Sequence, residues 1–148
     1  PIVKPPYSRI TAVDLDRGEF RWQVPFGATP DAIRNHPALK GLSLPRTGQT
    51  TSVGTIVTKG LVIAGETTIT TAGHPRGALL RAYDKHTGKD AGAVLMPAPQ
   101  TGSPMTYMWH GRQYIVVAIS GPSTPGQYVA FALPDTAPSA RPTTGGAQ

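Results

Sequence analysis

Hydrophobic and polar side chains alternate in short stretches along most of the chain, and turn-forming residues separate these stretches. This pattern is typical of half-buried β-strands. The predicted strands cover residues 9–15, 19–24, 53–58, 61–65, 78–84, 93–96, 105–109, 112–119 and 127–133. About nine short strands joined by tight turns indicate an all-β protein built as a sandwich, a barrel or a propeller.

One helix interrupts this pattern. Thr29 and Pro30 form a helix start, with Thr29 as the N-cap and Pro30 in the first helical position. Pro37 limits the helix to a short one. Residues 38–51 and 66–77 are predicted to be loops. Residues 135–148 are polar and rich in Pro, Gly, Thr and Ala, so we expect one domain over residues 1–134 and a disordered tail after it.

Composition supports the all-β prediction and excludes several classes of function. The 148 residues include 17 Gly and 16 Pro, which favour turns over helices. There is no cysteine, so disulfides and thiolate metal sites are excluded. The formal net charge is +6, but its cations are scattered, so we expect no nucleic-acid partner. No apolar run is long enough to predict a membrane span.

Two segments 70 residues apart share the pattern A-x-D-x-x-x-G at the end of a predicted strand. Its members are Ala12, Asp14 and Gly18 in the first copy and Ala82, Asp84 and Gly88 in the second. The Asp can accept hydrogen bonds from the turn amides, and the Gly can supply the positive φ that closes the turn. Trp22 follows the first copy, and Gly92 stands at the corresponding position of the second. A repeat of this period is typical of propellers and arrays.

This pattern resembles A-x-D-x-x-T-G-x-x-x-W, the tryptophan-docking motif of the pyrroloquinoline-quinone (PQQ) dehydrogenases, which are eight-bladed β-propellers. Further stretches resemble the C-terminal region of the membrane glucose dehydrogenase-like branch of that family. They are 5–12 (PPYSRITA), 80–84 (LRAYD), 102–107 (GSPMTY), 111–117 (GRQYIVV) and 129–134 (VAFALP). The resemblance implies antiparallel four-stranded sheets, here about two blades plus a closing strand, with one short helix.

The chain departs from the family pattern at three positions. Arg17 replaces the usual Thr of the motif, and Gly92 replaces the second docking Trp. Gly77 stands where the glucose dehydrogenase-like enzymes place an Asp near the cofactor. The resemblance implies PQQ with Ca²⁺ or Mg²⁺ in the full-length family, with the catalytic Asp and the metal ligands in earlier blades. We therefore assign no catalytic residue and no metal ligand to this chain, and we expect no cofactor to be held by it alone.

Two residues are candidate contacts to the cofactor. Glu66 ends the apolar strand 61–65, where a propeller could display its carboxylate toward the axis, and a solvated strand-end carboxylate is the alternative that we favour. Arg76, in the loop 66–77, could meet a carboxylate of PQQ, and a surface arginine is its favoured alternative. The four histidines (His36, His74, His86 and His110) fall in turns or before prolines and lack metal-ligand spacing.

Two hypotheses about function remain open at this stage. The first is a C-terminal piece of a PQQ-dependent sugar or alcohol dehydrogenase, whose partners are the missing blades and whose parent family is periplasmic. Such a piece would contribute scaffold and part of the cofactor pocket, and would be inactive alone. The second is a stand-alone β-module that self-associates through its open sheet edges, with a structural or binding role.

Overall fold

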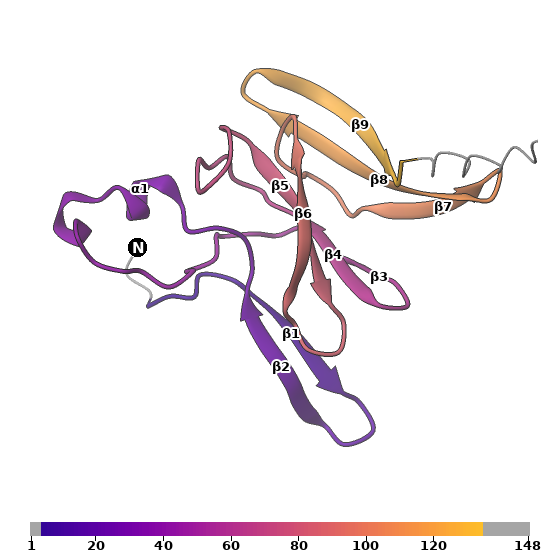
Figure 1. Cartoon of the computed structure of the whole chain (residues 1–148), viewed down its shortest axis with the longest axis horizontal. Coiled ribbons are helices and arrows are strands. Elements are labelled where there is room, and N and C mark those ends of the chain that lie inside the picture. The colour runs from indigo at the N-terminus through magenta and orange to yellow at the C-terminus, as the bar shows by residue number, and fades with distance from the viewer. Residues whose placement is uncertain (1–3, 135–148) are drawn as a thin grey trace, which may run out of the picture.

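The computed structural model describes residues 4–134, and these fold into three antiparallel sheets (Figure 1). The predicted disordered tail at residues 135–148 lies outside the described residues. The strands are β1 (Arg9–Asp14), β2 (Glu19–Pro25), β3 (Ile56–Val57), β4 (Leu61–Gly65), β5 (Ala78–Asp84), β6 (Asp90–Met96), β7 (Met105–Trp109), β8 (Arg112–Gly121) and β9 (Thr124–Ala132). The all-β antiparallel class predicted from the sequence is confirmed.

The strands divide among the sheets as two, four and three. The orders are β1-β2, β3-β4-β5-β6 and β7-β8-β9, so each sheet is a meander of strands that are consecutive in the sequence. Within residues 4–134, the middle sheet is the one that has four strands. β9, which covers most of the last predicted strand at residues 127–133, is the third strand of the last sheet, where it pairs with β8. Short turns keep consecutive strands adjacent and antiparallel.

The middle sheet lies between the other two and is covered on both faces (Figure 1). Alternation along β4 explains this, because successive side chains point to opposite faces. Ile63 belongs to a cluster with residues of the last sheet, such as Ile119. Val62 and Ala64 belong to a second cluster, against which the first sheet packs. The uninterrupted apolar sequence of β4 is therefore that of a strand buried on both faces.

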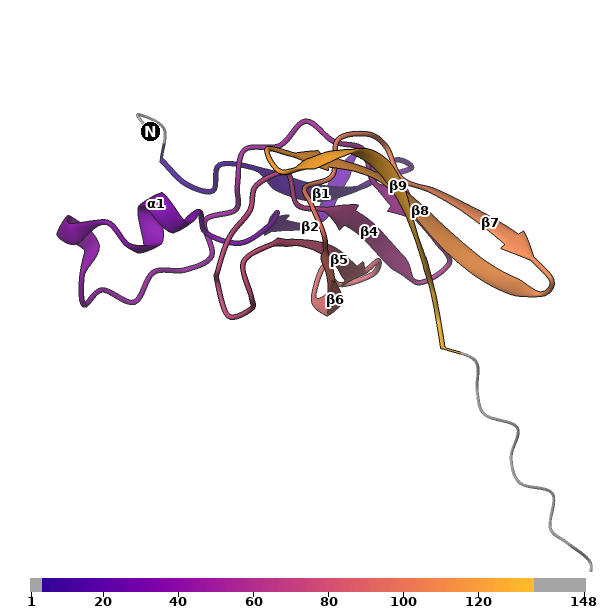
Figure 2. The ribbon, with the colours of Figure 1, turned by 90° about the horizontal axis from the view of Figure 1, so that it is seen from above.

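The excursion between β2 and β3 carries the helix α1 (Asp31–Arg34) and a 3₁₀ turn (Pro37–Leu39) and projects from one end of the sheets (Figures 1 and 2). The helix is short, as predicted, but Pro30 and not Thr29 is its N-cap residue. The Thr29 hydroxyl accepts a hydrogen bond from the Thr47 amide at 3.1 Å, so it closes the base of the excursion instead. No helix within residues 4–134 is long and apolar enough to cross a bilayer.

Candidate functional site

The longer loops gather at one end of the three sheets, which we call the rim. It is formed by the excursion 26–55, the loop 66–77, the connection 97–104 and the turn 121–123 (Figure 1). The short turns at residues 15–18, 58–60, 85–89 and 110–111 lie at the opposite end. This separation follows from the meander topology, since every second connection returns to the same end of a sheet. The rim is where side chains from different sheets meet.

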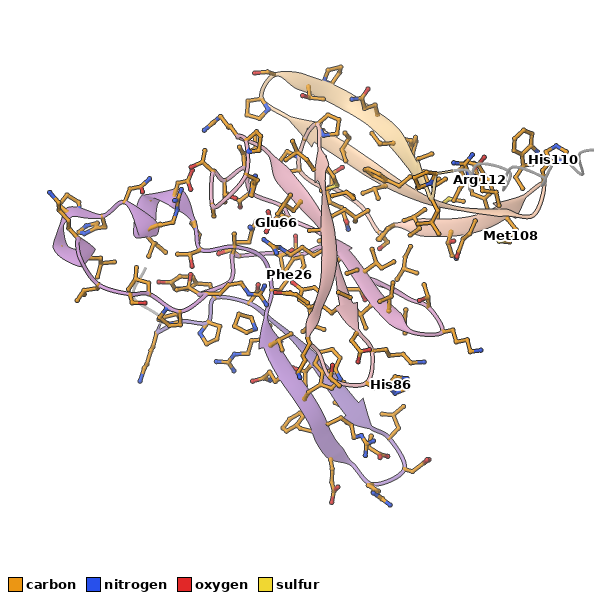
Figure 3. The ribbon with its side chains drawn as sticks, viewed as in Figure 1. Phe26, Glu66, His86, Met108, His110 and Arg112 are labelled. Carbon is orange, nitrogen blue, oxygen red and sulfur yellow. The ribbon has the colours of Figure 1, made fainter. Side chains whose placement is uncertain are left out.

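Glu66 lies at the centre of the rim and is completely buried (Figure 3). Its Oε1 accepts hydrogen bonds from the Ala28 amide at 2.8 Å and from Nε of Arg81 at 2.7 Å. Its Oε2 accepts a third from the Leu79 amide at 3.1 Å. The favoured expectation of a solvated strand-end carboxylate is therefore wrong. Residues 26–28 fold over the end of β4 and exclude water from a carboxylate that three donors satisfy.

Two glutamines complete the polar interior of the rim, and the sequence analysis did not single them out. Gln100 is buried; its Oε1 accepts from the Gly65 amide at 2.6 Å, and its Nε2 donates to the carbonyls of Gly54 and Gly102. Gln49, also buried, accepts from the Thr68 amide at 2.8 Å. Both side chains occupy gaps between loops that are distant in sequence. In the sequence, the only local signal for these two glutamines is the Gly or Pro that precedes each of them, Gly48 and Pro99.

Arg76 is exposed, at the point where the loop 66–77 returns to the sheet. It lines a groove of 220 Å³ at the rim, between this loop and the turn 121–123 of the last sheet. Ser123 and Thr124 line the opposite wall. A guanidinium beside hydroxyl groups and exposed backbone suits a carboxylate ligand. Glu66 and Arg76 thus have different environments, since the carboxylate of Glu66 is buried and Arg76 lines an open groove.

The histidines lie apart from one another. His86 and His110 occupy separate turns at the end opposite the rim (Figure 3), and the ring of His74 contacts the hydroxyl of Thr70. Within residues 4–134, no three residues among His, Cys, Asp and Glu lie close enough together to hold a metal ion.

The two repeated turns have the same geometry at the end opposite the rim. Asp14 Oδ1 accepts from two turn amides, at 3.1 and 3.2 Å, and Asp84 Oδ1 accepts from two at 3.0 and 2.8 Å. Gly18 and Gly88 close the turns with φ angles of 69° and 71°. At the second turn the hydroxyl of Thr87 also donates to Asp84, at 2.9 Å, a bond that Arg17 cannot form in the first.

Trp22 connects the first sheet to the second turn. Its Nε1 donates to the carbonyl of Lys85 at 2.9 Å. Its ring lies directly over Gly88, where an added Cβ would come within 2.6 Å of the indole. Glycine is therefore required at this position for two reasons, the positive φ and the close approach of the ring. The tryptophan of one sheet is thus held by the turn of the next sheet.

These features define a class of protein, namely stacked antiparallel sheets in which a repeated Asp-to-Gly turn receives a tryptophan from the preceding sheet. The chain belongs to the PQQ-dependent dehydrogenase family. The family described as glucose/ethanol/alcohol dehydrogenase, beta-propeller domain, matches residues 1–115. The resemblance stated from the sequence is therefore confirmed.

The chain is similar to several dehydrogenases. A probable quinate dehydrogenase (quinone) of Xanthomonas campestris pv. juglandis is 33% identical over 91% of this chain and 17% of its own length. The glycerol dehydrogenase large subunit of Gluconobacter thailandicus is 35% identical over 89% of this chain and 17% of its own length. The quinoprotein glucose dehydrogenase A of Acinetobacter calcoaceticus is 32% identical over 91% and 16%. The chain thus spans about a sixth of the length of these relatives.

Proposed function

We propose that this chain serves as a C-terminal part of a PQQ-dependent sugar or alcohol dehydrogenase, in which it supplies scaffold and one wall of the cofactor pocket. The observation that carries the proposal is the docking of Trp22 on the second Asp-to-Gly turn in a chain of this family. The outer sheets have two and three strands against four in the middle sheet. The remaining blades of the propeller are the partners that would complete them. A periplasmic location, as in the parent family, belongs to the same proposal.

The rim is the part of the chain that would face the cofactor. Arg76 lines an open groove and can pair with a carboxylate of the quinone through its guanidinium. Glu66 is sealed and would act indirectly, because its bonds to Leu79 and Ala28 hold the start of β5 against the excursion. The loop that carries Arg76 is anchored where that strand starts. When bound in the assembled enzyme, the quinone would supply a hydride acceptor for the alcohol, and a divalent cation held by the other blades would supply a Lewis acid.

Among residues 4–134, the two carboxylates at the rim, Glu66 and Asp31, are both engaged by hydrogen-bond donors. The carboxylate of Glu66 accepts three hydrogen bonds and has no exposed surface. Asp31, which also lies at the rim, is held by Arg34 and Thr71. We therefore propose that the catalytic Asp and the metal ligands come from the other blades. Alone, the chain would not oxidise alcohols. The sequence predicted that it holds no cofactor by itself, and because the groove of Arg76 is open we propose weak PQQ binding in place of that prediction.

The test is a titration of the 148-residue chain with PQQ in the presence of Ca²⁺, followed by a dye-linked assay on glucose, glycerol and quinate. We expect weak binding that Arg76→Gln reduces by about tenfold, the loss of roughly one charge-assisted contact. Arg17→Gln, which removes an exposed arginine from the opposite end, is the matched control and should bind as the unaltered chain does. Turnover by the chain alone would refute the proposal that the catalytic Asp and the metal ligands come from other blades. Equal binding of PQQ by both variants would show that Arg76 does not contact the cofactor.

A further inference from the structure

The structure contains a gap where the repeat leads one to expect an aromatic ring. In the first sheet Ala12 pairs with Trp22, and the pairing shifts by one residue directly after Ala12. In the middle sheet Ala82 pairs with Gly92, and the same shift follows directly after Ala82. Trp22 and Gly92 therefore occupy the same place in the two sheets, including the bulge. A Cβ added at Gly92 would meet nothing within 4 Å.

An apolar groove of 440 Å³ lies at this place, between the middle sheet and the last sheet. The middle sheet contributes Leu61, Ile63, Leu80, Ala82 and Val94 to its walls, together with Gly92 itself. The last sheet contributes Ile115, Phe131, Ala132 and Leu133. The groove is the counterpart of the space that Trp22 fills between the first two sheets.

A backbone carbonyl equivalent to the one that binds the indole N–H of Trp22 is also present beside this groove. Asp84 is the last paired residue of β5, opposite Leu61, and Ala132 is the last paired residue of β9, opposite Tyr114. Lys85 and Leu133 therefore hold the same position, directly after their strands. The Lys85 carbonyl accepts from Trp22. The Leu133 carbonyl instead accepts from the guanidinium of Arg112, in its own sheet. An occupant of the groove therefore does not need an N–H group to satisfy that carbonyl.

We propose that the groove at Gly92 binds an uncharged, flat, bicyclic aromatic molecule about the size of an indole. Apart from Arg81, whose guanidinium is paired with Glu66, the side chains of the walls are aliphatic and aromatic, so burying an apolar ring there is favourable. An apolar cavity of about 150 Å³ is enough to bind benzene, so this groove has room for a second fused ring. The site lies on the flank of β6, between the sheets, and is separate from the groove of Arg76 at the rim.

The site is tested with 3-methylindole, which reproduces the tryptophan side chain from its Cβ outward. The protein is the 148-residue chain with labelled methyl groups, observed by NMR. We expect saturable shifts at the methyl groups of Ile115, Leu61 and Val94. Naphthalene should compete for the same methyl groups, because no N–H group is required. A saturated ring system of the same carbon number should bind at least tenfold more weakly, because it is too thick for a place shaped for an indole.

Two variants on β6 make the test specific. Val94 faces the groove and is 47% exposed, so Val94→Phe fills the groove with a ring attached to the chain. Leu95 is 45% exposed and points to the other face of the same strand, so Leu95→Phe adds a ring elsewhere. We expect the first variant to lose at least tenfold in affinity for 3-methylindole and the second to keep it.

The methyl shifts of the unaltered chain locate the site even where a variant fails to fold. Shifts that never saturate, or that appear around Trp22 and not around Ile115, would overturn the proposal. Equal loss of affinity in both variants would do the same, because only one of them reaches the groove.

Discussion

Replacing Glu66 with glutamine tests whether the rim depends on a buried charge. The change keeps the size and shape of the side chain and removes only the negative charge and one acceptor. The new amide oxygen can still accept from Ala28 and from Arg81. The new NH₂ group then points at the Leu79 amide, which is also a donor. The guanidinium of Arg81, only 13% exposed, loses its countercharge.

The expected cost follows from these contacts. The bond from the Ala28 amide becomes neutral, and the bond from Arg81 loses the negative one of its two charges, so that each contributes about 1 kcal/mol less. The part-buried Leu79 amide loses its acceptor, which costs about 1–3 kcal/mol. The sum is a loss of about 3–5 kcal/mol in the free energy of unfolding, or about 10–15 °C in Tm for a chain of this size.

Urea unfolding followed by circular dichroism measures this loss, with the m-value checked for constancy. Glu19→Gln is the matched control, because Glu19 is an exposed carboxylate on β2, and it should leave the midpoint unchanged. Arg81→Met combined with Glu66→Gln should cost less than the sum of the single changes, because the two side chains share one ion pair. A loss below about 1 kcal/mol for Glu66→Gln would refute the reasoning, since an exposed carboxylate behaves in that way.

Three further predictions concern the repeated turn. Gly88→Ala should cost about 2–3 kcal/mol in urea unfolding, because it strains a φ of 71° and pushes against the Trp22 ring; Gly60→Ala, in open space, should be neutral within about 0.5 kcal/mol. Trp22→Phe should cost about 1–2 kcal/mol through the lost indole hydrogen bond; an unchanged midpoint would contradict the docking role. The side-chain hydrogen bond from Thr87 holds the pKa of Asp84 below its ordinary 3.8, so its contribution to stability is complete above that pH and is lost as the pH falls below it; Asp84→Asn should flatten this acid limb, and an unchanged limb would contradict the assignment.

The strands were predictable because their patterns depend on neighbouring residues. β5 and β7 have the bounds that alternation predicted, and the turn at His110 and Gly111 has the positive φ angles of a two-residue hairpin loop. β3 was predicted as six residues and is only two, Ile56–Val57. A hydrophobic pattern shows that a segment can pair but not how far it does, since β4 has five residues and only two of them pair with β3.

The polar interior of the rim was not predictable in the same way. Glu66 is followed by Thr67 and Thr68 at the start of a long loop, so local sequence favours exposure. Its burial depends on residues 26–28, which follow β2 at the start of the excursion, and on Arg81, which lies 15 positions later. Gln49 and Gln100 are in the same situation, since each satisfies amides or carbonyls of distant loops. Contacts of this kind leave no periodic signal in the sequence.

The docking of Trp22 has a direction, from one sheet to the next along the chain. Trp22 of the first sheet packs on the turn of the second sheet, whereas the second sheet has Gly92 at the corresponding position and no tryptophan that could pack on the third. The first boundary thus combines a hydrophobic cluster with one directional contact, the indole of Trp22 on the second turn. The second boundary has an aliphatic cluster spread over both sheets. In a nearest-neighbour description of stability, the two coupling energies should respond differently to mutation, because only the first contains a term that one substitution at Trp22 removes.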